Sequence, residues 1–349
     1  MLPTIKLVLD GRHYGGIEAH VCQLYHRLKL SGRKVEVVLI SSYPESSFIL
    51  QLKMQKVAFI ELNGRWHHKL SQLKRHHQQG VLHAHGYKAS ILCRMATLGS
   101  GRPCVTTFHN GDPGKGKLAL YLWADLQSSS LSLNLAVSRA IQHRVGGDCR
   151  LIRNWVSRPT VCKSRFGRPF TLGFVGRLCA DKGFDRFVAL SRALPQYRWH
   201  SFGDGEMVSL IKGSAIVHHG QVADMPRRLP ELDALILTSR YEGLPMVALE
   251  AMACGVPVIA FDVGDLSQLV DNQVGTLVES GNMDAMTQAV IQMASHPAHR
   301  LAELSAKAKE RIIHHWSGDD SLALCLSLYG QCSRDADDPD REARADLQG

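Results

Sequence analysis

Apolar residues in the first half of the chain occur in short runs that alternate with amphipathic stretches. Such runs, bounded by polar residues and glycines, are typical of buried β-strands, whereas residues 17–29 have apolar positions at helical spacing. We expect the strands at residues 6–9, 35–40, 57–62, 81–85, 104–108 and 133–137. Strands that alternate with helices predict a parallel, doubly wound sheet.

A second series of apolar runs begins near Thr171, where residues 171–176 predict a strand that enters a glycine turn. The further strands of this series are expected at residues 198–202, 215–219, 234–238 and 257–261. After Gln292 the pattern is helical, and residues 322–329 form the last apolar segment. The sequence therefore predicts an α/β protein with two Rossmann-like, doubly wound domains, for which 349 residues suffice.

Composition places the chain among ordinary globular proteins, because 45% of its residues are hydrophobic and 21% are charged. It contains no apolar run of about eighteen residues, and its first ten residues resemble a short strand rather than a secretory signal. Nine cysteines are scattered without a C-x-x-C pair, which favours reduced, buried thiols. We therefore expect a cytoplasmic protein.

The charge is divided unevenly along the chain. Residues 1–168 carry 25 Lys and Arg against 8 Asp and Glu, a net charge of +17, and the rest carries 16 against 24, a net charge of −8. No aromatic-interleaved RNA motif, zinc finger or helix-turn-helix accompanies the basic half, so we expect no nucleic-acid partner. We favour an anionic membrane surface, or an anionic glycolipid acceptor held there, which would make the protein peripheral on the inner face of the cytoplasmic membrane.

The most informative segment is residues 240–255 (RYEGLPMVALEAMACG). Pro245 suits the first turn of a helix and Gly255 suits its end, which places Glu250 about one and a half turns inside and Glu242 in the preceding loop. The free N–H groups near residues 244–247 would form an anion site between the two carboxylates. A diphosphate flanked by a ribose and a hexose fits this layout, so the segment predicts a nucleotide-sugar site.

This segment resembles the donor-site signature of the retaining GT-B glycosyltransferases of the family 4 type (glycosyl transferases group 1), which have two glutamates separated by seven residues. Further matches occur in the family's order over residues 5–330. They are residues 15–18 (GGIE), 107–110 (TFHN), 175–178 (VGRL), 181–185 (DKGFD), 202–205 (FGDG) and 255–260 (GVPVIA). Their common order makes the resemblance specific.

The resemblance implies two domains that face a cleft, with the acceptor bound by the first domain, the nucleotide sugar bound by the second, and a terminal helix that returns to the first. We expect an acceptor-binding domain at 1–160, a donor-binding domain at 161–318, the returning helix at 319–332 and a disordered tail at 333–349. The connector between the domains departs from the family's usual Asn-Gly-Val-Asp, because Trp155 and Ser157 replace Gly and Asp.

Arg177 and Lys182 follow a predicted strand and a glycine, five residues apart. Paired cations at this place would neutralise a diphosphate leaving group while the glycosidic bond breaks. The alternative is two solvated surface cations, as most Lys and Arg side chains are. We assign both to catalysis and donor binding, because Glu242 and Glu250 accompany them.

The two glutamates are assigned to hydroxyl groups of the donor: Glu250 to the ribose and Glu242 to the transferred sugar. A solvated helix-surface carboxylate is the alternative for Glu250, although its neighbours are apolar nearly all round. The other residues expected to bind the donor are Gly15, Gly16, Gly243, Leu244 and Pro245. After residues 263–264 the family usually has a second glycine and a Glu, whereas this chain has Asp265 and, in place of the Glu, Gln268.

His109 ends an apolar strand, where active-site groups of open α/β sheets are found. The resemblance implies that it bonds the donor sugar, and we assign it to catalysis. His85 is a weaker candidate for acceptor binding, and a structural role is the alternative for both. Four adjacent pairs of histidines occur elsewhere in the chain, at 67–68, 76–77, 218–219 and 314–315, and no Asp-x-Asp motif is present, so we expect no metal site and no cofactor.

Two basic, partly apolar stretches suit a membrane surface, namely residues 66–79 and 115–123. Ordinary packing of both on the sheet is an equal alternative. The expected activity is metal-independent transfer of a hexose-type sugar, with retention, to a glycan or glycolipid in cell-envelope polysaccharide or lipopolysaccharide synthesis. The alternatives are a nucleotide-sugar-binding subunit without turnover and an enzyme like the UDP-N-acetylglucosamine 2-epimerases. The donor's base and sugar, the acceptor, the linkage and the oligomeric state cannot be read from the sequence.

Overall fold

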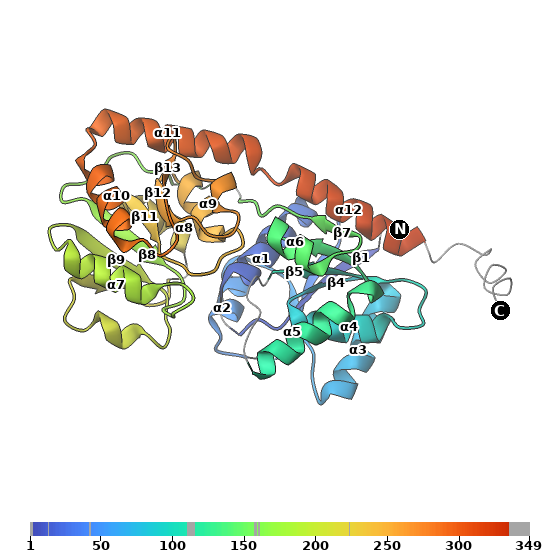
Figure 1. The fold of residues 1–349 in the computed structure, drawn as a ribbon. Coiled ribbons are helices and arrows are strands. Elements are labelled where there is room, and N and C mark those ends of the chain that lie inside the picture. Colours follow the sequence, from blue (N-terminus) through green and yellow to red (C-terminus); the bar gives the residue numbers. More distant parts are fainter. Residues whose placement is uncertain are drawn as a thin grey trace. The chain divides into compact units, whose positions relative to one another are not determined.

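The computed structural model describes residues 3–12, 14–41, 43–109, 116–156, 159, 161–222 and 224–334. The chain forms two compact units (Figure 1). The amino unit runs to Ile152 and resumes at Asp319, and the carboxyl unit is Arg153–Gly318. Within the described residues, no helix is both long and apolar enough to cross a membrane.

The division between the units lies earlier than the expected boundary at residue 160. Residues 153–156 belong to the carboxyl unit, because the Asn154 side chain donates a 2.8 Å hydrogen bond to the carbonyl of Leu244. Trp155 is buried against Gly318, where a β-carbon would lie only 2.3 Å from the indole ring. These long-range contacts set the boundary. Ser157 of the predicted connector lies outside the described residues.

The sheet of the amino unit has seven strands in the order β3-β2-β1-β4-β5-β6-β7, and all of its pairs are parallel. The strands are β1 Thr4–Leu9, β2 Val35–Leu39, β3 Phe59–Glu61, β4 Gly80–His85, β5 Cys104–Phe108, β6 Ser132–Ala136 and β7 Cys149–Leu151. The helices before the domain boundary are α1 Gly16–Leu30, α2 Ser47–Met54, α3 Trp66–Gln79, α4 Tyr87–Thr97, α5 Lys117–Gln127 and α6 Arg139–Val145. The six strands expected here are present, and strand β7 is additional, because the arginine at its centre breaks any apolar run.

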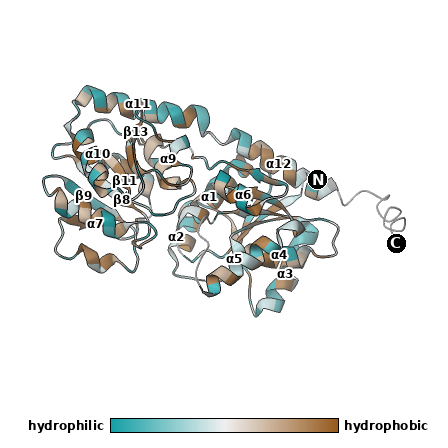
Figure 2. Cartoon of the chain, viewed as in Figure 1, coloured by the Kyte–Doolittle hydropathy of each residue, from teal (hydrophilic) through white to brown (hydrophobic). Residues whose placement is uncertain are grey.

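The carboxyl unit has a six-stranded parallel sheet in the order β10-β9-β8-β11-β12-β13. The strands are β8 Thr171–Val175, β9 Arg198–Phe202, β10 Ile216–His218, β11 Ala234–Leu237, β12 Val258–Phe261 and β13 Gly275–Val278. The helices are α7 Phe184–Ala193, α8 Met225–Arg228, α9 Met246–Ala253, α10 Met283–Ser295 and α11 Ala298–His315. Hydrophobic and hydrophilic residues alternate along α11, as Figure 2 shows. The prediction of two doubly wound Rossmann-like units is confirmed.

The last helix, α12 Asp319–Arg334, belongs to the amino unit and packs against β4, β5 and α1. Its buried residues recur at helical spacing, and they are Ser321, Cys325, Leu328, Tyr329 and Cys332. The helix includes Ser333, whose hydroxyl donates to the Tyr329 carbonyl at 2.8 Å, so the expectation of disorder from residue 333 onward is wrong at its first two positions. Residues 335–349 lie outside the described residues.

Candidate functional site

Helix α9 carries the segment that the sequence singled out. Pro245 stands at its N-cap in an extended conformation, one residue before the first helical residue, and Gly255 follows its end with a φ of +79°. Ala248, Leu249, Ala251 and Met252 are buried. No side chain caps the first turn, in which the Ala248 N–H donates to the Pro245 carbonyl at 3.1 Å, and the N–H groups before Ala248 face the predicted anion site, which stays a prediction.

Glu242, in the loop before α9, is held on two sides. Lys182 Nζ lies 2.7 and 2.8 Å from its two carboxylate oxygens, and the Ser239 hydroxyl donates to Oε1 at 2.7 Å. The Glu242 side chain is only 7% exposed, whereas that of Lys182 is 34% exposed. The structure therefore joins two predicted site residues, Lys182 and Glu242, in a partly buried ion pair. The sequence did not predict this pair, because 60 positions separate its members.

Arg177 follows β8 and has much more freedom than Lys182. Its side chain is 65% exposed, its nearest carboxylate is Asp181 at 3.9 Å, and its Nε contacts the Cys179 sulfur at 3.3 Å. These contacts are loose, so an incoming phosphate can compete for the guanidinium. Arg177 and Lys182 lie in one unit, on the short segment between β8 and α7.

Close backbone approaches hold that segment in place. Gly203 has a φ of +124°, and a β-carbon there would lie 1.9 Å from the Gly176 carbonyl oxygen. Gly183 has a φ of +67° at the start of α7, and its β-carbon would collide with the Thr238 carbonyl at 1.9 Å. Both positions require glycine. These approaches bring the Arg177 and Lys182 segment against the ends of β9 and β11.

An ion pair that the sequence analysis missed supports the same loops. The Arg240 guanidinium binds both oxygens of Asp185 at 2.8 and 2.7 Å, and its backbone N–H donates to the Asp181 carbonyl at 2.8 Å. The Arg240 side chain lowers the pKa of Asp185 through these hydrogen bonds. Asp185 and Arg240 lie in the quoted motifs, but no sequence spacing shows that they meet. They connect the loop of Glu242 to the start of α7.

Glu250 lies in α9 and is partly buried. Among the described residues no group donates a hydrogen bond to its carboxyl group, and burial raises its pKa to about 7. A carboxyl group without a protein partner is suited to receive ligand hydroxyls. Its position is as predicted, and its ribose role stays a prediction.

The raised pKa of Glu250 predicts a pH effect on stability. Because the pKa in the folded protein, about 7, exceeds the ordinary value of 4.5, the folded state binds more protons between these pH values. The free energy of unfolding of the wild type should therefore fall, relative to that of Glu250→Gln, as the pH rises from about 5 to about 8, by up to about 3 kcal/mol. Urea denaturation of both proteins across this range measures it, and parallel pH profiles would contradict the raised pKa.

The segment after β12 packs on the loop that carries Glu242 through Gly264 and Asp265, whereas Gln268, which departs from the family's usual Glu, makes none of these contacts. The Asp265 N–H donates to the Gly243 carbonyl at 2.9 Å, and Gly264, with a φ of +62°, lies against the Glu242 carbonyl. Gln268 ends a short 3-10 turn and is exposed. Leu244 and Met246 are buried beside this loop.

In the amino unit, Gly15 is the N-cap of α1 and Gly16 is its first residue. The Gly15 N–H donates to the Glu18 carboxylate at 3.1 Å, and burial raises the pKa of Glu18 to about 7. Both glycines are exposed, and a β-carbon at Gly16 would meet nothing within 4 Å. The fold itself therefore does not require Gly16, and the open space is compatible with the predicted donor loop.

Four histidines gather where β4 and β5 end and α1 passes. His85 Nδ1 lies 3.0 Å from His109 Nε2, and the His20 ring lies 5.6 and 5.0 Å from these two rings. Behind them, His83 is bonded at 2.7 Å to both Tyr329 and Thr107. Burial lowers the pKa of His83 to about 3 and the pKa values of His85 and His109 well below the ordinary value, so these rings are neutral. His85 and His109 were predicted from the sequence, whereas His20 and His83 were not, because no sequence spacing shows that α1 and β4 bring them to this place.

A cavity of about 160 Å³ opens beside His109 in the amino unit. Its lining is mainly apolar and consists of Gly86, Tyr87, Phe108, His109, Ala119, Leu122, Trp123, Asp125, Leu126 and Arg144. On the same helix, α5, Leu120, Tyr121 and Trp123 are strongly exposed. The cavity can therefore take a small apolar group next to His109.

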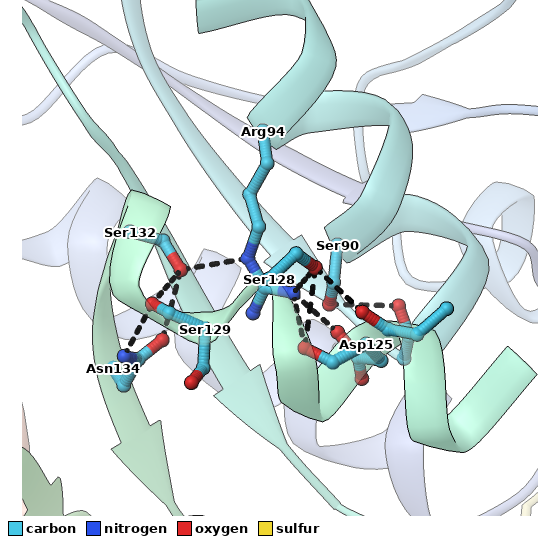
Figure 3. Close-up of polar contacts among 9 residues, drawn as sticks. Ser90, Arg94, Asp125, Ser128, Ser129, Ser132 and Asn134 are labelled. Atoms are coloured by element: carbon cyan, nitrogen blue, oxygen red, sulfur yellow. Dashed lines mark hydrogen bonds and ion pairs between the residues drawn. The ribbon is translucent and has the colours of Figure 1, made fainter. Parts of the chain in front are cut away.

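A buried ion pair fixes α5 beside that cavity. Arg94 of α4 donates to the Asp125 carboxylate and carbonyl at 2.7 Å, to Ser128 at 2.9 Å and to Ser132 of β6 at 2.8 Å (Figure 3). Arg94 and Asp125 are both almost completely buried. The cavity wall formed by α5 therefore depends on this pair.

Two family profiles match the chain. The profile described as Glycosyltransferase Family 4 matches residues 14–156, and the profile described as Glycosyl transferases group 1 matches residues 169–296. Together they cover the main part of both units.

Curated relatives and solved structures agree with these matches. A phosphatidyl-myo-inositol mannosyltransferase of Mycobacterium leprae is 24% identical over 87% of this chain and 90% of its own length. A poly(ribitol-phosphate) alpha-N-acetylglucosaminyltransferase of Staphylococcus aureus is 25% identical over 45% of this chain, which spans only 35% of that protein. The crystal structure of Anabaena HepE in complex with UDP and glucose superposes with a TM-score of 0.80, at 18% identity over 93% of this chain and 98% of HepE, and shares the fold.

Proposed function

The chain belongs to the GT-B glycosyltransferases of the family 4 type, and from this premise we propose that it transfers a hexose-type sugar from a nucleotide-sugar donor, with retention, to a glycan or glycolipid acceptor. One observation carries the proposal. The uncapped start of α9 lies between Glu242 and Glu250, in the same unit as Arg177 and Lys182. This set offers N–H groups and cations to a diphosphate and carboxylates to hydroxyl groups.

The proposed mechanism is a front-face substitution in which the leaving diphosphate assists the incoming acceptor. Arg177 and Lys182 stabilise the charge that develops on the leaving group, while Glu242 and His109 orient the sugar. The contact between Lys182 and Glu242 is compatible with this role. An ammonium group has three N–H donors, and because two of them reach the carboxylate, the third can donate to a phosphate oxygen. The two cations take the place of a metal ion, so turnover needs no metal and no cofactor.

The donor we favour is a uridine-linked hexose or N-acetylhexosamine, with GDP-mannose next. The complex of HepE with UDP and glucose and the mannosyltransferase activity of the Mycobacterium leprae relative support these two choices. The acceptor we propose belongs to cell-envelope polysaccharide or lipopolysaccharide synthesis.

A donor panel tests the proposal. UDP-, GDP-, ADP- and dTDP-sugars are each assayed for slow hydrolysis without acceptor and for thermal stabilisation. We expect one donor to stabilise the protein and to be hydrolysed, with both effects lost in Glu250→Ala. Stabilisation without hydrolysis, either alone or with lipid-linked acceptors, would favour a binding subunit over an enzyme. No response to any donor would refute the proposal.

We also propose that the amino unit binds an anionic membrane surface that carries the acceptor. Residues 1–152 carry 20 Lys and Arg against 8 Asp and Glu, a net charge of +12, and this charge together with the exposed apolar residues of α5 supports the proposal. Trp66, at the start of the basic helix α3, is likewise 62% exposed.

Flotation with vesicles that contain anionic lipid tests the membrane proposal. We expect binding at low salt that weakens as salt increases, and weaker binding of Leu120→Ser than of the wild type, because this side chain is 63% exposed on α5. Leu30→Ser is the matched control, since Leu30 is an 85% exposed leucine on another helix of the same unit. Equal losses in both variants, or no flotation at low salt, would count against the proposal.

A further inference from the structure

Three histidines from three separate elements converge in the amino unit. His20 comes from α1, His85 from the last position of β4, and His109 from the residue after β5. One ring nitrogen of each lies within 4.8 Å of those of the other two. Because β4 and β5 are neighbours in the sheet, their ends bring His85 and His109 together, and α1 adds His20, whose ring centroid lies 5.6 and 5.0 Å from theirs.

The surroundings of His85 point to a ligand. This side chain is 2% exposed, and its Nε2 is buried without a hydrogen-bond partner within the described part of the chain. A buried ring nitrogen of this kind is costly unless something binds it. His83 does not join the group, because both of its nitrogens already bond, to Tyr329 and to Thr107. Its ring packs 4.3 Å from that of His85 and supports it from behind.

We propose that His20, His85 and His109 form a binding site for a divalent transition metal of the zinc type. Three imidazoles are the ligand set that suits Zn²⁺, Co²⁺, Ni²⁺ and Cu²⁺. Tetrahedral bonds of about 2.0–2.1 Å separate ligand nitrogens by about 3.4 Å. One nitrogen of each ring already lies within 4.8 Å of the others, so small ring movements reach this spacing, and the 3.0 Å contact between His85 Nδ1 and His109 Nε2 gives way when the ion binds. His109 is the least buried of the three and lines the cavity beside α5, which gives an ion a route of entry.

The metal would act as an inhibitor and not as a cofactor. When a metal occupies His109, this side chain can no longer contact the donor sugar, which is the role that the proposed function gives it. The expected inhibition therefore rests on the proposed function. The binding itself does not. Turnover without metal and inhibition by a metal are therefore both expected of the same protein.

The test measures metal binding directly on the full chain, without donor or acceptor. Chelator-treated wild type is titrated with Co²⁺, followed by visible absorption, and with Zn²⁺, followed by calorimetry. We expect one ion per chain with the absorption of a tetrahedral site, and affinity at least about 100-fold weaker in His20→Gln, since even the loss of a supporting group costs up to that much. The double variant His67→Gln/His68→Gln is the matched control, because it removes two adjacent, exposed imidazoles from the same unit and should leave this affinity unchanged.

Two further measurements keep the outcomes distinct. If His20→Gln does not fold by circular dichroism, His109→Gln replaces it, since His109 is less buried. Equal affinity of the wild type and the folded variant would overturn the inference, as would loss of binding in the His67/His68 control alone. Failure of the donor panel with intact metal binding would instead refute the proposed glycosyl transfer, so the two failures are separable.

Discussion

Arg177→Ala and Lys182→Ala are each expected to lower turnover by about 10²–10³-fold, comparable to the loss of one charge-stabilising donor in an active site. The reason is that each side chain is proposed to meet the negative charge of the departing diphosphate. The measurement is kcat and KM with the donor that the panel identifies. The double variant is expected to retain even less turnover, and full turnover in it would refute the assignment.

The two cations differ as tests of the mechanism. Arg177 is 65% exposed with only loose contacts, so its removal should change the free energy of unfolding by no more than about 0.5 kcal/mol. Removal of Lys182 leaves the Glu242 carboxylate, which is 7% exposed, without its ammonium partner, and some destabilisation is expected. Lys212→Ala is the matched control, because Lys212 is an exposed lysine of the same unit outside these loops. A similar loss of turnover in this control would show that charge at a distance, not contact, is responsible.

Arg94→Met is expected to lower the free energy of unfolding by about 3–5 kcal/mol, because it leaves the Asp125 carboxylate buried and unpaired. The substitution also removes the hydrogen bonds from Arg94 to Ser128 and Ser132, which join α4 to the end of α5 and to β6 (Figure 3). Urea denaturation measures the change. The α5 wall of the cavity should loosen as well, since Asp125 belongs to both the pair and the lining.

A double variant separates the pair from its surroundings. Arg94→Met/Asp125→Leu removes both charges and keeps apolar volume, so it should be clearly more stable than Arg94→Met. Arg150→Met is the control, because Arg150 also pairs with an aspartate in the amino unit but at 3.6 Å and at the surface. A loss below about 1 kcal/mol in Arg94→Met would mean that the ion pair contributes little to this fold.

Helix α9 shows how much of the local structure the sequence predicts. The sequence placed Pro245 in the first turn of α9 and Gly255 at its end; the structure has Pro245 one residue earlier, at the N-cap, and Gly255 in a left-handed conformation after the end. Strands β5 and β9 have the predicted bounds, because each is a short run of residues suited to a strand that ends at polar or glycine residues. Strands β7 (CRL) and β13 (GTLV) were not predicted, because an arginine in the first and a glycine and threonine in the second leave no continuous apolar run.

The site itself was only half readable from the sequence. Glu242, Glu250, Arg177 and Lys182 were chosen for their chemistry and order, and the structure places all four in the carboxyl unit. That Lys182 pairs with Glu242, and Arg240 with Asp185, depends on loops 55–60 positions apart that meet only when β8 and β11 become neighbours. The boundary near residue 153 likewise follows from contacts of Asn154 and Trp155 with distant residues.

By itself, the sequence determined the α/β class, the two series of strands, the approximate start and end of α9, and the family of the chain. Each of these depends on neighbouring residues and on the order of motifs. Only the tertiary structure decided which side chains share a site. His20, His85 and His109 are far apart in the chain, and no spacing predicts their meeting. The order of β4 and β5 in the sheet, with α1 packed beside them, brings the three together, and strand order is a property of the whole fold.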